Sequence, residues 1–437
     1  MAKINKFIVQ YAEVFKGLRV NFNEAKPPKN LIKRFVKIIS VEVNDPRYEN
    51  MCTYPLEVIL SISFLAVLGD CKTWGEIADF GNDYKKWLSK FLPIGKTMPI
   101  DDTYRRVFSL LDSNELTKAT INYITFLFRK IKDTLYKYNI QSDKEYKLIN
   151  IDGKEARATG RMYNTPDKVS NFHTLNVYDA SDGISLFSIP ISEKTNEIPE
   201  AQKILSTMNL KNVIVTLDSL HAQHKTFDII LNKKGDYLIG IKGNQGDAFE
   251  EIQLLTTNDY LDKLSSKSDS YIKIDEYKEY FKIPFSYFAI ESGLLKDGTP
   301  KWNGIKNIIC YRKVVKKTGE VDTRYFATTL NDINLAVEAI VGRWDVENLL
   351  HRYLDMDFGE DTNKTMDKNA YTNLSIINKL CLTILKLVKP ILENRSMRRI
   401  KKSMGRSLSS YLSIILSAIN PDEIEKILNE KINENNI

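Results

Sequence analysis

Residues 146–154, YKLINIDGK, and residues 213–221, VIVTLDSLH, decide the fold of this chain. Each segment is a short apolar run that predicts a buried strand and is followed by an aspartate, Asp152 or Asp218. The same periodicity predicts the neighbouring elements, which are strands over 172–178 and 184–190, a helix over 198–208, a helix over 222–231 and a strand over 237–241. The predicted order is therefore β-β-β-α-β-α-β.

This order predicts an α/β fold with a mixed sheet that carries helices on both faces. Hairpin-connected strands followed by helical crossovers form the ribonuclease-H-like arrangement, in which the first and fourth strands lie side by side. The two aspartates that follow these strands, Asp152 and Asp218, would then meet at one sheet edge, where the sites of open α/β sheets collect. The alternative is that each is a turn residue, a position that aspartate favours.

Helices precede this core, and further strands interrupt it. Apolar residues at helical spacing over 55–140 predict a helical domain, in which Arg105 and Arg106 suit either a helix-turn-helix DNA reader or any small bundle. Alternation over 270–290, with strands near 305–314 and 325–329, predicts a β-rich insertion. We expect a basic N-terminal arm (1–44), the helical domain (45–140), the first part of the catalytic core (145–250), the β-rich insertion (251–330), the second part of the core (331–394) and a basic C-terminal tail (395–437).

The composition is that of a globular protein with a mild excess of basic residues. The 437 residues include 63 Lys and Arg against 56 Asp and Glu, with 43% hydrophobic and 27% charged residues, which excludes a disordered or fibrous chain. The net charge of residues 1–37 equals the +7 of the whole chain. This arm is either a solvated basic segment or one that contacts phosphates.

Cysteine usage and hydropathy favour a cytoplasmic protein. Cys52, Cys71, Cys310 and Cys381 are far apart, which argues against a disulfide framework or a cysteine-rich zinc site. The N-terminus lacks the pattern of a secretory signal. The most apolar run, residues 56–69, is shorter than the roughly 20 residues that span a bilayer.

A third acid, Glu347, completes a candidate metal site. It lies in the predicted helix that contains RWDVENLLHRYLDMDFGED (343–361), where Arg343, Glu347 and His351 share one face at spacings of i, i+4 and i+8. Magnesium prefers carboxylate oxygens, and three carboxylates can hold two such ions about 4 Å apart. Such a pair of ions suits phosphodiester cleavage and strand transfer.

Taken in order, six segments resemble a DDE transposase of bacterial insertion sequences, in the branch with a Tyr-Arg-Glu-Lys signature and the group of H-repeat-associated proteins. The segments are 45–81, IDGK (151–154), ISEKTNEIP (191–199), VTLDSLHAQ (215–223), GDYLIGIKGNQG (235–246) and 343–361. The resemblance implies that Asp152, Asp218 and Glu347 are the catalytic and metal-binding acids and that Arg343 is the signature arginine. The signature Tyr and Lys positions fall on Ile340 and Leu354.

The family resemblance also implies partners and a cofactor. We expect Mg²⁺, with Mn²⁺ as a substitute, double-stranded DNA as substrate, a homodimer on that DNA, no membrane association, and a cytoplasmic protein that joins the nucleoid when bound to DNA. Candidate DNA contacts are Lys242, Asn244 and Gln245 in KGNQG, together with Lys194, Asn196 and His351. The alternative for the KGNQG segment is a glycine-rich turn.

The alternative function is a catalytically inactive or domesticated descendant, either a DNA-binding protein or a nuclease without strand joining. Glu155, which follows the IDGK segment, motivates this reading because it adds a negative charge beside the predicted metal site.

Overall fold

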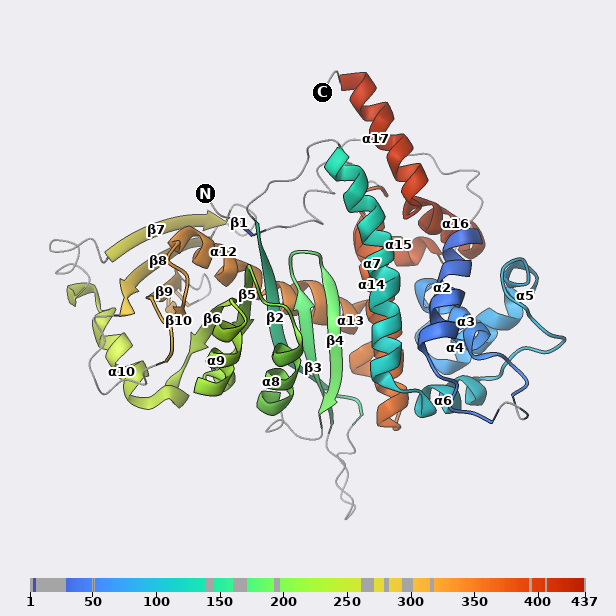
Figure 1. The fold of residues 1–437 in the computed structure, drawn as a ribbon, viewed down its shortest axis with the longest axis horizontal. Helices are drawn as coiled ribbons and strands as arrows, with labels where there is room; N and C mark the ends of the chain where they lie inside the picture. Colours follow the sequence, from blue (N-terminus) through green and yellow to red (C-terminus); the bar gives the residue numbers. More distant parts are fainter. Residues whose placement is uncertain are drawn as a thin grey trace, which may run out of the picture.

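One mixed sheet and a set of helices beside it make up the described chain (Figure 1). The computed structural model describes residues 3–4, 29–48, 50, 52–137, 145–159, 171–191, 197–260, 271–278, 283–292, 302–314, 318–392, 395–404 and 407–435. Among the described helices, we find none with the length and apolar character needed to cross a bilayer.

The first half of the sheet has the predicted order of elements. These are β2 (Glu145–Ala156), β3 (Phe172–Asp179), β4 (Ile184–Ile191), α8 (Glu197–Thr207), β5 (Val213–Leu217), the 3₁₀ turn η3 (Ser219–His221), α9 (His224–Asn232) and β6 (Asp236–Ile241). β3 pairs antiparallel with β2 and β4, whereas β5 pairs parallel with β2 and β6. The predicted neighbourhood of the first and fourth strands is therefore confirmed.

The β-rich insertion extends this same sheet. After the 3₁₀ turn η4 (Gly243–Gln245) and α10 (Gly246–Leu255), the strands are β7 (Tyr271–Lys278), β8 (Ile283–Glu291), β9 (Asn307–Val314) and β10 (Val321–Thr328). β10 pairs antiparallel with β6, so the strand order is β4-β3-β2-β5-β6-β10-β9-β8-β7, and the short β1 (Lys3–Ile4) pairs parallel with β2. Trp302 packs near the Phe227 ring in the core.

Side chains alternate along each strand, so successive residues face opposite sides of the sheet. Different helices cover these two sides. Val213, Val215 and Leu217 of β5 belong to the core that contains α8 and α9. On the opposite face, Leu148 and Ile214 pack against α12 (Ile333–Arg343). Polar residues that continue this second face are therefore directed towards α12 and the helices after it.

The remaining helices form a second body beside β4 (Figure 1). We call this set the helical body; it comprises α2 (Lys29–Glu42), α3 (Leu56–Leu68), α4 (Trp74–Asp83), α5 (Lys85–Leu88), α6 (Asp101–Leu110), α7 (Ser113–Lys137), α14 (Lys368–Val388), α15 (Met397–Met404), α16 (Leu408–Ala418) and α17 (Pro421–Asn435). α2 comes from the predicted basic arm and α15 to α17 from the predicted tail, yet all of them bury apolar residues in this core. Arg105 and Arg106 of α6 both pair with Asp102.

Helix α14 connects the helical body to the sheet. It contacts α3, α6 and α7 as well as β4, and from Ala370 to Val388 its residues are buried. Lys386, one of these residues, donates a hydrogen bond from Nζ to the Tyr178 hydroxyl at 3.0 Å. Burial lowers the pKa of Lys386 to about 7, with the charge of Asp345 opposing this effect.

The buried amine of Lys386 should make stability depend on pH. Because its pKa is lower in the folded chain than in the unfolded chain, the unfolded state binds more protons between about pH 7 and 10.4, and stability rises with pH across that window. We expect Lys386→Met to remove a slope of at most about 1.4 kcal/mol per pH unit from the free energy of unfolding. Urea unfolding at several pH values measures it, with the exposed Lys402→Met as control. Equal slopes in all three proteins would contradict the assignment.

Candidate active site

The parallel pairing of β2 with β5 sets the position of two acids. The paired residues run from Lys147 opposite Val213 to Asn150 opposite Thr216. Asp152 and Asp218 each lie two residues beyond the last pair, at the same end of the two strands. The prediction that the first strand ends at Asp152 is wrong, because β2 continues to Ala156 by pairing with β3 after β5 has ended.

Alternate residues of β2 contact successive parts of the C-terminal half of the chain. Asn150 accepts a hydrogen bond on Oδ1 from Thr216 Oγ1 at 2.7 Å and donates from Nδ2 to the Gly342 carbonyl at 2.9 Å. A Cβ atom at Gly342 would collide with Leu148 Cδ2, so any other residue would force the buried Leu148 side chain or the end of α12 to shift. The end of α12 is therefore fixed over β2 and β5, directly before Arg343.

The segment with the third acid departs from a regular α-helix. After α12, residues Val346–His351 form a π-helical turn, η6, and α13 (Arg352–Met356) follows. The prediction that Arg343, Glu347 and His351 lie on one uninterrupted α-helix is therefore wrong. The side chains of all three residues nevertheless reach the site. Arg343 contacts Asp218, Glu347 lines the cavity described below, and His351 lies beside Asp152. Single π turns inside α-helices are frequent at functional sites.

Asp152, Asp218, Glu347 and Arg343 line one cavity of about 440 Å³. The four residues come from β2, the end of β5, η6 and α12. The lining also includes Thr323, Arg324, Tyr325 and Phe326 of β10, together with Trp344. The structure thus brings together the three acids and the arginine that the sequence singles out, and the β-rich insertion supplies part of the wall.

Asp218 is paired with two cations. Lys242 Nζ lies 3.0 Å from Oδ1 and 3.2 Å from Oδ2, and Arg343 Nη2 lies 3.1 Å from Oδ1. Burial alone would raise the pKa of Asp218. The hydrogen bonds from Lys242 and from the Ser219 backbone N–H, with the charge of Arg343, outweigh burial and lower the pKa. Asp218 is therefore a carboxylate at neutral pH.

Asp152 has the opposite environment. Burial and the neighbouring charges of Glu347 and Asp218 raise its pKa to about 7, and the charge of Arg343 opposes them. Within the described residues, no three His, Cys, Asp or Glu side chains form a finished metal-binding group. The donor chemistry nevertheless fits a hard divalent cation, because such an ion takes carboxylate oxygens and would relieve the repulsion around Asp152.

The other predicted site residues fall in three places. Lys242, Asn244 and Gln245 follow β6, and both amides donate to the Ser219 carbonyl, at 3.2 Å from Asn244 and 2.8 Å from Gln245. They therefore brace the turn after Asp218, with Lys242 exposed. Lys194 and Asn196 lie outside the described residues. His351 is largely buried, a position that favours a role towards Asp152 over a contact with DNA.

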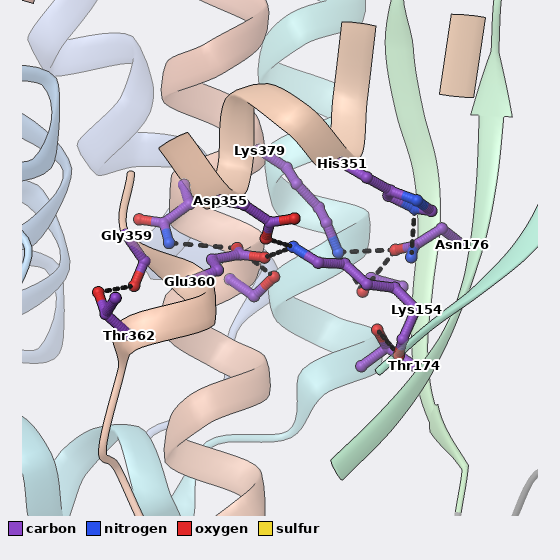
Figure 2. A network of polar contacts seen from close by, with 12 residues as sticks. Lys154, Thr174, Asn176, His351, Asp355, Gly359, Glu360, Thr362 and Lys379 are labelled. Carbon is purple, nitrogen blue, oxygen red and sulfur yellow. Dashed lines mark hydrogen bonds and ion pairs between the residues drawn. The ribbon is translucent and has the colours of Figure 1, made fainter. Parts of the chain in front are cut away.

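Sequence reasoning missed a buried polar network that joins Lys154, Glu360 and Lys379 to their neighbours (Figure 2). Lys154 of β2 forms ion pairs with Glu360 and Asp355, and Lys379 of α14 donates to Asn176 of β3. Burial alone would raise the pKa of Glu360, but the charges of Lys154 and Lys379 outweigh it and lower the pKa to about 2. Two features of the sequence could have indicated this network: Lys154 in the IDGK segment and Lys379 within an otherwise apolar helical run.

Comparisons with known proteins cover the part of the chain that contains the site. Residues 143–384 match the family described as "Transposase DDE domain", and residues 36–124 match "DDE_Tnp_1-associated". The chain is 25% identical over 407 residues to "Putative transposase YncI" of Escherichia coli O157:H7, covering 89% of this chain and 95% of that protein. It is 26% identical over 400 residues to "H repeat-associated putative transposase YhhI" of Escherichia coli K12, covering 88% and 98% respectively.

Substitution of Gly342 tests how the site is held together. We expect Gly342→Ala to destabilise the fold by about 1–3 kcal/mol, because the added methyl group collides with Leu148 and lifts the end of α12. Gly75→Ala is the matched control, since a methyl group there meets nothing within 4 Å. Urea unfolding compares the two variants. If Gly342→Ala were as stable as the control, the close approach would not hold α12 in place.

Proposed function

The chain belongs to the DDE transposases, in their H-repeat-associated group, and from this premise we propose that it is an active transposase of an insertion sequence. It binds the terminal inverted repeats of its element, cleaves the phosphodiester bonds beside their 3′ ends and joins these ends to target DNA. The observation that carries the proposal is the convergence of Asp152, Asp218 and Glu347, which are far apart in sequence, on one cavity.

The strand arrangement supports a ribonuclease-H-like catalytic domain. Three antiparallel strands, β4, β3 and β2, are followed by the parallel strands β5 and β6, with helices between them. The strands of the insertion lie between Asp218 and Glu347 in sequence and beside β6 in space. Because the inserted strands separate Asp218 from Glu347 in sequence, these two acids come together only when the domain folds.

We propose that Asp152, Asp218 and Glu347 hold divalent cations, Mg²⁺ or Mn²⁺. Bound there, these ions would activate the attacking water or 3′-hydroxyl and stabilise the leaving oxygen of the phosphodiester. The chain's own residues provide the electrostatic frame. Lys242, the Ser219 N–H and Arg343 together keep Asp218 ionised. Lys242, which is exposed beside Asp218, is the residue of the cavity best placed to exchange its carboxylate partner for a DNA phosphate.

DNA is the proposed partner of the exposed residues at this end of the sheet. Lys242, Asn244 and Gln245 follow β6 beside Asp218, and Arg324 of β10 lies 5.5 Å from the centre of the Trp344 ring in the cavity wall. Basic and amide side chains of this kind bind the sugar–phosphate backbone. Joining two element ends requires that two active sites act together, so we propose a homodimer on DNA.

The position of Glu155 bears on the alternative of an inactive DNA-binding descendant. Along β2, Asp152 and Lys154 lie on one side of the strand and Glu155 on the other. Glu155 is exposed and accepts a hydrogen bond from Asn171 Nδ2 at 2.6 Å. Its charge is thus directed away from the proposed metal site, which favours the active enzyme.

A cleavage assay on linear DNA that carries the element's ends tests the function. We expect Mg²⁺-dependent cleavage by the wild type and a loss of about 10²-fold or more in Asp152→Asn, because the substitution removes the charge of a metal ligand. Asp133→Asn, at an exposed position of α7, is the control, and a gel-shift assay checks that DNA binding persists.

Two results would favour the alternatives. Stable DNA binding by the wild type without cleavage in Mg²⁺ or Mn²⁺ indicates an inactive descendant. Cleavage without joining of the 3′ ends to a target indicates a nuclease.

A further inference from the structure

A chain of polar side chains runs from Lys379 of the buried helix α14 to His351 (Figure 2), and His351 lies beside Asp152. Lys379 Nζ of α14 donates to Asn176 Oδ1 of β3 at 2.8 Å. Asn176 Nδ2 lies 3.3 Å from His351 Nε2, and His351 Nδ1 lies 3.6 Å from Asp152 Oδ2. Asn176 is also the residue directly opposite Asp152 in the β2–β3 ladder. We call Lys379, Asn176 and His351 the polar relay.

Lys379, at the buried end of the polar relay, determines which of its groups donate and which accept hydrogen bonds. A lysine ammonium group only donates hydrogen bonds, so the oxygen of the Asn176 side chain must face Lys379. The hydroxyl of Ser188 donates to the same oxygen at 3.3 Å. The NH₂ group of Asn176 is therefore directed towards His351 and can act there only as a donor.

This polarity selects one tautomer of His351. Because Asn176 donates to Nε2, this nitrogen must carry a lone pair, and the proton of the neutral ring must be on Nδ1. The resulting Nδ1–H faces Asp152. We propose that His351 is a positioning residue, held in the Nδ1–H tautomer by Asn176 and Lys379, which directs one carboxylate oxygen of Asp152 to itself and leaves the other for the cavity.

The surroundings hold both ends of the polar relay in place. Lys154, two residues after Asp152 on the same side of β2, pairs with Asp355 and with Glu360. Glu360 in turn accepts hydrogen bonds from Ser375 at 2.8 Å and Asn378 at 3.2 Å, both on α14. Glu360 thereby joins β2 to α14, while Asn176 joins β3 to α14. The distance of 3.6 Å to Asp152 is longer than a hydrogen bond, and such contacts often shorten only when an active site is loaded.

The proposal rests on the proposed function for its role in cleavage, but the tautomer is a property of the protein alone. NMR of the full chain labelled with ¹⁵N-histidine, without DNA or metal, measures it directly. The chain has four histidines, and the signals of His351 are identified by their loss in His351→Asn. We expect a protonated Nδ1 and an unprotonated Nε2.

The isosteric variant Asn176→Asp tests the cause. Its carboxylate still pairs with Lys379 but can only accept from His351, so we expect a proton to appear on Nε2. A wild-type ring already protonated on Nε2, or a variant spectrum identical to that of the wild type, would overturn the proposal.

Two further variants separate positioning from packing. In His351→Asn the amide nitrogen can occupy the place of Nδ1, whereas in His351→Gln it can occupy only that of Nε2. Titration with Mn²⁺ in the absence of DNA should give near wild-type affinity for His351→Asn and a loss of about 10-fold or more for His351→Gln. Equal losses in two variants with the same urea midpoint would show that His351 only fills space.

The readouts also separate this proposal from the proposed function. If the protein shows the expected tautomer and Mn²⁺ affinities but does not cleave element ends, the positioning role of His351 is supported and the proposed transposase activity is contradicted.

Discussion

The parallel pairing of β2 with β5 is the constraint on which the site depends. Its register ends at Asn150 and Thr216, and the two aspartates lie an equal distance beyond it. Thr216 donates to Asn150, and Asn150 in turn donates to the carbonyl of Gly342 and so holds the end of α12. Shifting this register by one residue would turn Asn150, Asp152 and Lys154 to the opposite face of the sheet and separate them from every partner in the C-terminal half.

Positive charge is unevenly distributed around the three acids. Lys242 and Arg343 both pair with Asp218, and Lys154, the next lysine along β2, is paired with Asp355 and Glu360. Burial lowers the pKa of His351 to about 3, so this ring adds no charge at neutral pH. Asp152 therefore faces Glu347 with little compensation, which supports the proposal that cations complete the site.

The parts of the fold that could be predicted depend on local patterns. Apolar runs that end in aspartate identify β2 and β5, and the order of elements is sufficient to place them side by side. The continuation of β2 to Ala156 and the π turn at Val346–His351 depend on partners distant in sequence, so periodicity could not show them. The role of Lys379 could not be predicted from its apolar helix, because its polar partners lie on β3 and β4. The DNA contacts and the domain boundaries stay predictions.

Anomalous X-ray diffraction from crystals soaked in Mn²⁺ tests most directly whether the three acids form a metal centre. We predict anomalous peaks in the cavity between β2, β5 and η6, in contact with Asp152, Asp218 and Glu347, and their loss in crystals of Asp152→Asn. An empty cavity at saturating Mn²⁺, with Asp218 still paired to Lys242 and Arg343, would contradict the assignment of these acids as metal ligands.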